Sequence, residues 1–253
     1  MLELIDVWKG PKRVTSQDEC TLAGVTLTIP SGRRIGLLGS EASDNSMVLR
    51  MLSGIEEPDK GVLRRVGTPC WPLDYSGFTD NSATLRQNAS FLGRIYGVDA
   101  DEMTRIAGML SGVRPVRGRP MRQYSGVDRR ALELGLTLSL QFDWYFVDEK
   151  LPKALDGTED AIHAAITDRV SRASLVWASS NAKFLSEFCD AGLLLDQGKL
   201  TFYDRFEEAA AAYTNLNPSQ VKARNEDDGQ SGGNKRRRRA ARRARQNGLE
   251  EPV

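Results

Sequence analysis

The sequence predicts an α/β fold in which buried parallel strands alternate with helices and a helical region is inserted between strands. Two observations support this prediction. Short apolar runs alternate with helical stretches along most of the chain, as expected when helices connect the parallel strands of a sheet. Between residues 78 and 140, apolar residues instead recur three and four positions apart, which is typical of helices.

The first strands are expected at residues 2–7 and 21–30. A short buried strand follows at residues 34–38 and ends at Gly39, and residues 46–52 have helical character. Strand, glycine turn and helix in this order form the opening of a phosphate-binding βα unit. The turn is therefore the first candidate for a functional site.

Strand signals return after the helical region, at residues 142–147, 174–178 and 191–195. The hydrophobic pattern predicts a domain at residues 1–213, and residues 214–253 are polar. Such a composition has too few apolar groups to form a core, so a disordered linker and tail are expected there.

The composition indicates a globular cytoplasmic protein with a basic tail. The formal net charge is only +1, but residues 235–245 (KRRRRAARRAR) carry eight positive charges, and subtracting these leaves −7 for the rest of the chain. No run approaches the roughly 18 apolar residues that span a bilayer, and the N-terminus lacks the layout of a signal peptide. Three cysteines without metal-ligand spacing are expected to be reduced and buried: Cys20, Cys70 and Cys189.

Four segments in order resemble landmarks of the ATP-binding subunits of ABC transporters, and the capsular-polysaccharide exporters are the most similar branch. The segments are IPSGRRIGLLG, WPLDYSGF followed by NASFLGRIYG, WYFVDE, and FCDAGLLLDQGKL. The resemblance implies a P-loop NTPase-like fold with a mainly parallel sheet, an antiparallel β edge and a helical subdomain at about residues 78–140. It also implies ATP and Mg²⁺ as cofactors, a membrane permease as partner, and a position on the inner face of the cytoplasmic membrane.

The phosphate loop departs from the family pattern G-x-x-x-x-G-K-[ST]. In that pattern the second glycine lets backbone N–H groups close around the phosphates, the lysine neutralises their charge, and the hydroxyl ligates Mg²⁺. Here Gly39 and Ser46 are retained, whereas the second glycine is Asp44 and the lysine is Asn45. The loop is therefore expected to act as a strand-to-helix turn capped by Asp44 or Ser43.

The two carboxylates after the strand at residues 142–147 are retained. The resemblance implies that Asp148 and Ser46 would hold Mg²⁺ and that Glu149 would polarise the attacking water. Carboxylates without a phosphate or a metal have nothing to act on. We expect Glu149 to be a vestigial catalytic residue and both carboxylates to hold the loops at the strand end.

The signature segment of the family is also altered. Ser125 and Gly126 match it, but Val127 and Asp128 follow. A branched side chain and a negative charge then stand where the backbone should approach the γ-phosphate held by a partner subunit. We expect this segment to be a weak nucleotide contact.

Three further family positions carry other residues. Thr79 replaces the glutamine of the WPLDYSGF region, and the aromatic residue that stacks on adenine would fall near Pro11, with Trp8 close by. Ser180 occupies the position of the switch histidine. The one histidine of the chain, His163, lies in a helical stretch and is expected to be an ordinary helix residue.

Three functions remain open from the sequence. The first is a non-hydrolysing subunit that binds no cofactor and acts as a structural or regulatory partner of a permease, in a homodimer or with an intact ATPase subunit. The second is a soluble scaffold or regulator outside transport, whose basic tail binds anionic lipid or nucleic acid. The third is an active ATPase in which an arginine such as Arg50 replaces the lysine.

Overall fold

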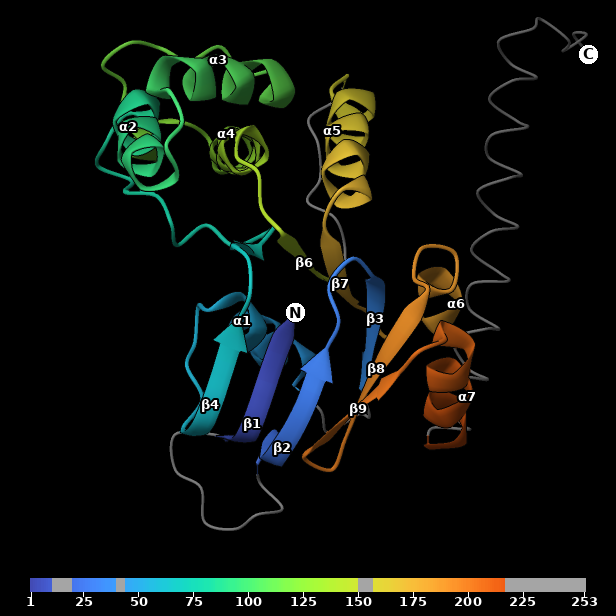
Figure 1. Cartoon of the computed structure of the whole chain (residues 1–253). Helices are drawn as coiled ribbons and strands as arrows, with labels where there is room; N and C mark the ends of the chain where they lie inside the picture. Colours follow the sequence, from blue (N-terminus) through green and yellow to red (C-terminus); the bar gives the residue numbers. More distant parts are fainter. Residues whose placement is uncertain (11–19, 40–43, 150–156, 217–253) are drawn as a thin grey trace, which may run out of the picture. The chain divides into compact units, whose positions relative to one another are not determined.

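The structure, a computed structural model, describes residues 1–10, 20–39, 44–149 and 157–216 (Figure 1). It divides into two compact units, residues 1–210 and residues 211–253. The first unit contains both β-sheets and every candidate site residue that the structure describes.

The larger sheet has six strands in the order β5-β6-β7-β3-β8-β9 (Figure 1). Neighbouring strands run parallel except at one edge, where β9 pairs antiparallel with β8. The inner strands are almost wholly buried, which explains their unbroken apolar runs and confirms a mainly parallel sheet. The strands are β3 Arg34–Gly39, β5 Pro69–Pro72, β6 Trp144–Asp148, β7 Ser174–Ala178, β8 Ala191–Asp196 and β9 Lys199–Tyr203.

The second sheet has three antiparallel strands in the order β2-β1-β4, which confirms the antiparallel β edge as a separate sheet. Its central strand buries Leu2, Leu4 and Val7. The strands are β1 Leu2–Lys9, β2 Leu22–Ile29 and β4 Lys60–Arg65. The sequence did not predict β4, because only Leu63 of its six residues is buried and no apolar pattern marks it.

Three α-helices form the insertion between β5 and β6, which confirms the expected helical region. They are α2 Leu85–Tyr96, α3 Ala100–Ser111 and α4 Gly126–Ser139, with a short 3-10 helix at Met121–Gln123. Thr84 begins α2 through a capping box with Gln87, and Gly97 ends it in the left-handed conformation with φ 71°. Helix α3 packs against both α2 and α4 (Figure 1).

The first helix after the phosphate-loop position shares the main hydrophobic core with both sheets. Val48, Leu49, Met51 and Leu52 of this helix are at most 1% exposed, and they belong to one cluster with residues of β1, β3 and β6. This packing fixes α1 against β3. The remaining helices are α1 Asn45–Ser53, α5 Glu159–Ser171, α6 Ala182–Leu185 and α7 Phe206–Leu216.

Two details differ from the sequence-based expectations. Helix α7 continues to Leu216, beyond residue 213, where the hydrophobic pattern predicts the end of the domain. Cys70 and Cys189 are buried as expected, but Cys20 is only partly buried, so the prediction was wrong for that residue. Among the described helices, none is long and apolar enough to cross a membrane.

Candidate functional site

Asp44 caps helix α1 at the place where an ATP-binding loop would hold phosphate. Its Oδ1 accepts a hydrogen bond from the backbone N–H of Met47 at 2.8 Å. The N–H groups of a first helical turn are the donors that otherwise bind an anion. The expected cap by Asp44 is therefore confirmed, and it places a carboxylate at the helix N-terminus. Ser43, the other expected cap, lies outside the described residues.

Asn45, at the position of the family lysine, folds back over the end of strand β3. A Cβ atom added to Gly39 would lie 2.9 Å from Cγ and from Nδ2 of Asn45, so the side chain rests directly on the glycine. Its Oδ1 is buried and makes no hydrogen bond within the described part of the chain. The amide therefore fills space against the strand instead of extending from the loop.

Arg50, the candidate replacement for the lysine, already has a carboxylate partner. Its Nε donates to Glu56 Oε1 at 2.6 Å, and this hydrogen bond is the main cause that raises the pKa of Arg50. The charges of Glu56, Asp44 and Asp148 raise it further. Arg50 therefore lies within the electrostatic field of the loop and the strand end, but its guanidinium is bound to Glu56.

Asp148 ends β6 and Glu149 follows it directly, so both carboxylates lie at the carboxyl ends of the strands, where β6, β7 and β3 are neighbours. Asp148 is partly buried and pairs in register with Ala178 of β7. Glu149 is exposed and adopts a left-handed backbone conformation with φ 56°, uncommon for a residue with a side chain. The fold therefore brings these carboxylates to the same end of the sheet as the last residue of β3, Gly39.

Glu149 is held by three contacts with the end of β7. Its N–H donates to Ala178 O at 2.9 Å, and its carbonyl oxygen accepts from Trp177 Nε1 at 3.4 Å. Its Oε2 accepts from the hydroxyl of Ser179, also at 3.4 Å. Ser179 in turn donates its N–H to Leu37 O of β3 at 3.2 Å. Glu149 thus takes part in a set of contacts that connects the ends of three strands.

The signature residues lie elsewhere, at the start of α4 in the helical insertion (Figure 1). Ser125 caps this helix by accepting the N–H of Asp128 at 3.0 Å, and Val127 is 62% exposed. Within the described residues, no hydrogen bond joins Ser125 or Gly126 to the β3–α1 turn or to the end of β6. The signature residues therefore belong to the helical insertion and not to the sheet.

Thr79 makes a contact that the sequence did not predict. Its hydroxyl donates to Glu133 Oε1 of α4 at 2.7 Å. Glu133 is only 4% exposed, and its Oε2 is buried without a hydrogen-bond partner in the described residues. Burial is the main cause that raises the pKa of this carboxyl. The sequence feature that could have indicated this buried carboxyl is the single acidic residue in the otherwise apolar stretch LELGLTL of α4.

Replacing Glu133 with glutamine should make the stability of the protein less dependent on pH. Because the pKa of Glu133 is raised in the folded state, wild-type stability is fully present below the unfolded pKa and falls as the pH rises through the folded pKa. We expect Glu133→Gln to raise the free energy of unfolding by about 1 kcal/mol at about pH 8 and to change it little at about pH 4. Urea unfolding at both pH values tests this, with exposed Glu187→Gln as control. Equal effects of Glu133→Gln at both values would contradict it.

Trp8 lies on strand β1 and His163 lies on helix α5. The indole N–H of Trp8 donates to Asp6 Oδ1 at 3.0 Å, and Lys60 Nζ lies 5.8 Å from the ring centroid. The ring therefore packs on the three-stranded sheet, and Pro11 lies outside the described residues. His163 is exposed on α5, which confirms the expectation of an ordinary helix residue.

Comparisons with known proteins define the family to which this chain belongs. A model of the ABC transporter family matches residues 22–151, more than half of the chain. The chain therefore belongs to the ABC transporter family. Among solved structures it is similar to an ATP-binding subunit of an ABC transporter, with a TM-score of 0.61 and 15% identity over 85% of this chain and 99% of the other. This likeness confirms the ABC ATPase fold, with a mainly parallel sheet, an antiparallel sheet and an inserted helical region.

Curated relatives include ATP-binding subunits with capsule or polysaccharide names. The chain is 28% identical to the ATP-binding protein BexA of Haemophilus influenzae, over 79% of this chain and 90% of that protein. It is 26% identical to the capsule polysaccharide export ATP-binding protein CtrD of Neisseria meningitidis serogroup B, over 77% and 90%. It is 28% identical to the polysialic acid transport ATP-binding protein KpsT of Escherichia coli, over 75% and 88%. The expected resemblance to capsular-polysaccharide exporters is thus confirmed.

Proposed function

We propose that this chain is a nucleotide-binding-domain subunit of a capsular-polysaccharide export system that does not hydrolyse ATP. In this role it acts as a structural or regulatory partner on the cytoplasmic face of the membrane. The observation that supports this proposal most directly lies where a phosphate loop would be. Asp44 caps α1 there, and Asn45 folds over Gly39. The similarity to BexA, CtrD and KpsT supports the transport context.

These residues do not fit a triphosphate. Without the lysine the loop loses a charge-assisted hydrogen bond, of order 1.5–3 kcal/mol. A carboxylate about 5 Å from a phosphate charge adds a repulsion of roughly 3 kcal/mol at an effective dielectric constant near 20. Together these terms lower the affinity at least about a thousandfold. We therefore derive no hydrolytic step for this chain, although Ser46 and Asp148 supply oxygens of the kind that Mg²⁺ prefers.

This chain could still take part in a dimer of ATPase subunits without hydrolysing ATP itself. In the family, one subunit's phosphate loop faces the other's signature segment, so a partner with an intact loop would face Ser125 and Gly126 of this chain. One cluster of buried residues holds α1 against both sheets, which supports a folded and assembly-competent subunit. We therefore infer a membrane permease and an intact ATPase subunit as partners, with a homodimer as the other arrangement.

Co-purification tests this assignment. The full chain should be co-expressed with a capsule-export permease and an intact ATPase subunit, and the membranes solubilised and fractionated by size. We expect this chain in one complex with the permease. A complex that forms without this chain and excludes it would contradict the proposal.

The basic run at residues 235–245 favours a second function, that of a scaffold or regulator whose tail binds anionic lipid or nucleic acid. Each basic residue near an anionic membrane contributes about 1 kcal/mol. Deleting residues 217–253 should therefore abolish sedimentation with phosphatidylglycerol vesicles and retention of duplex DNA at low salt. The matched control keeps the tail but replaces its arginines with glutamine. Unchanged binding in both variants would exclude a role for the tail.

A third function, an active ATPase with a relocated cation, depends on Arg50. The ion pair with Glu56 occupies that guanidinium in the described structure. Arg50→Ala would abolish ATP hydrolysis if this function held. Under our proposal the variant and the wild type are equally inactive.

A further inference from the structure

The hydroxyl of Thr79 has one proton to donate and two acceptors within reach. Its Oγ1 lies 2.7 Å from Glu133 Oε1 of α4 and 3.4 Å from Ser76 O, which belongs to the same segment, residues 73–79, here called the β5 loop. If Glu133 is ionised, Thr79 must donate to it, and Ser76 O loses this bond. If Glu133 is protonated, its carboxyl can donate to Thr79, and Thr79 can then donate to Ser76 O.

The carboxyl of Glu133 lies where a negative charge is poorly compensated. The residue is 4% exposed, and its Oε2 has no hydrogen-bond partner in the part of the chain that the structure describes. The positive charges that act on it are those of Arg129 and Arg130 of its own helix, and their effect on its pKa is smaller than that of burial. A neutral carboxyl with one unpaired oxygen costs much less in such a place than a carboxylate does. The buried position therefore favours the protonated form.

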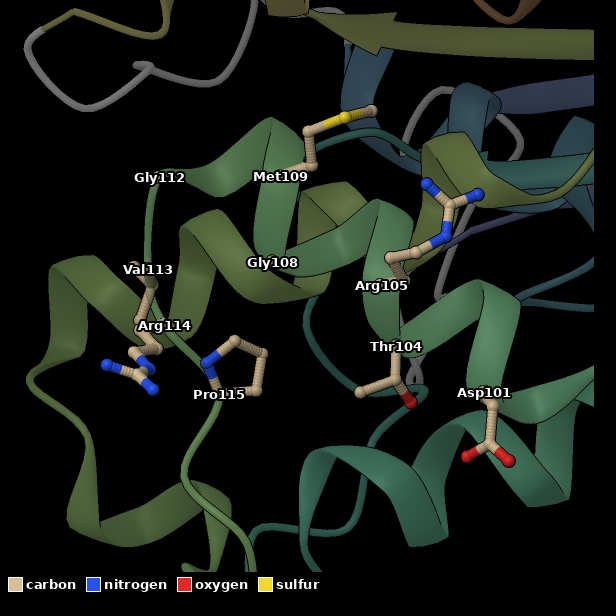
Figure 2. A pocket seen from close by; sticks show the side chains of 9 residues that line it. All are labelled: Asp101, Thr104, Arg105, Gly108, Met109, Gly112, Val113, Arg114 and Pro115. Carbon is tan, nitrogen blue, oxygen red and sulfur yellow. The ribbon is translucent and has the colours of Figure 1, made fainter.

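The charged groups of the helices packed against α4 have other contacts. Arg169 of α5 donates to Leu138 O of α4 at 3.0 Å, and Asp101 of α3 is paired with an arginine of α2 at 2.6 Å. Figure 2 shows the open pocket beside α3, of about 530 Å³, which Asp101 and Arg105 line. The lining of this pocket includes neither Glu133 nor any residue of the β5 loop. The carboxyl is therefore separate from that pocket.

The β5 loop lies between α4 and the carboxylate at the end of β6. Burial is the main cause that raises the pKa of Asp74 in this loop, the charge of Asp148 raises it further, and Arg130 of α4 lowers it. Just before the loop, Trp71 of β5 donates its indole N–H to the hydroxyl of Thr137 of α4 at 3.0 Å. That contact contains no titratable group, so the contact between Thr79 and Glu133 is the one that a proton can change.

We propose that Glu133 and Thr79 form a proton-controlled latch that holds the β5 loop on α4. With a proton on Glu133, the carboxyl, the Thr79 hydroxyl and Ser76 O form one chain of hydrogen bonds, and the latch is closed. When that proton passes to solvent water, a buried carboxylate remains, and the loop moves aside to let water reach the charge. The helical insertion is joined to the large sheet by this loop and by the segment between α4 and β6, so opening the latch loosens the insertion. This inference does not depend on the proposed function.

Opening of the latch should increase as the pH rises. In the open loop Glu133 is in water and has its ordinary pKa, whereas burial raises its pKa in the closed form. The closed form is therefore fully favoured below the ordinary pKa, and it loses this advantage as the pH rises through the raised pKa. Each pH unit between the two pKa values increases the open fraction about tenfold.

Hydrogen–deuterium exchange of the full chain between about pH 4 and about pH 9 tests the latch. Within and beside the loop, the N–H of Tyr75 donates to Pro72 O and that of Asp80 donates to Asn88 Oδ1, both at 2.8 Å, so these amides report opening. After correction for the intrinsic effect of pH on exchange, we expect the protection of residues 73–80 to fall at least about tenfold over this range. Residues 174–178 of β7 serve as the internal reference and should keep their protection.

Three variants assign the effect to the latch. Glu133→Gln cannot ionise, and its amide can donate to Thr79 as the protonated acid does, so the loop should stay protected at both ends of the pH range. Thr79→Val removes the hydroxyl and should lower the protection of the loop even at low pH, whereas Thr79→Ser keeps the hydroxyl and should behave as the wild type. Circular dichroism melting checks that each variant folds, and the two Thr79 variants keep the test decisive if Glu133→Gln does not fold. Loop exchange that is independent of pH in the wild type, equally pH-dependent in Glu133→Gln, or unchanged in Thr79→Val overturns the proposal.

Discussion

Replacing Asp44 with asparagine and Asn45 with lysine together is expected to raise the affinity for Mg·ATP by about a hundredfold to a thousandfold. Asparagine caps a helix as well as aspartate does, so the hydrogen bond to Met47 N–H is kept while the negative charge is removed. Lysine then supplies the missing cation. Titration calorimetry of the double variant and the wild type measures the change.

The single variants separate the two contributions. Asp44→Asn alone should recover the part of the Mg·ATP affinity that is lost to charge repulsion. Asn45→Lys alone should recover less of the affinity, because the new ammonium group can pair with Asp44. Urea unfolding should show that Asp44→Asn changes the free energy of unfolding by only a few tenths of a kcal/mol, since both residues are good caps. If the double variant binds no better than the wild type, these two residues are not what prevents nucleotide binding.

Replacing Gly39 with alanine is expected to lower the free energy of unfolding by about 2 kcal/mol. The new methyl group would lie 2.9 Å from Cγ and Nδ2 of Asn45, closer than nonbonded atoms approach. Asn45 must then leave its place against β3, or the turn must shift. Chemical denaturation of the full chain measures the loss.

A double-mutant cycle shows whether Asn45 is the cause. With Asn45→Ala as the background, Gly39→Ala should lower stability much less, giving a coupling of about 1–2 kcal/mol between the two positions. Gly126→Ala is the control glycine, since a Cβ there meets no atom within 4 Å. A coupling near zero would contradict the folded-back position of Asn45.

The sequence predicted the elements whose apolar patterns are unbroken. Strand β7 begins and ends at the residues expected, and β3, α1 and β8 are correct to within one residue at each end. Strands β5 and β9 were not predicted, because PCWP contains two prolines and KLTFY, at the sheet edge, has one buried residue. Little burial leaves β9 a weak sequence signal, whereas β5 has three buried residues and is hidden by its prolines.

The sequence predicted which residues occupy the candidate site, but it did not predict most of their side-chain contacts. Motif spacing located Gly39, Asp44 and Asn45, and hydrogen-bonding preference predicted the cap by Asp44. The packing of Asn45 on Gly39 and the burial of Glu133 against Thr79 depend on how distant elements meet, which no local pattern encodes. The contact of Arg50 with Glu56 spans only six residues, but it depends on how the chain turns after the end of α1, which the sequence analysis did not predict.

The central claim, that Asp44 and Asn45 leave this subunit without a working nucleotide site, is tested most directly by ATP binding to the wild-type chain. Titration calorimetry up to millimolar ATP, with and without Mg²⁺, is the measurement. We predict no detectable binding under either condition. Micromolar binding that requires Mg²⁺ would contradict the claim and point to an unconventional site that still uses Ser46 and Asp148.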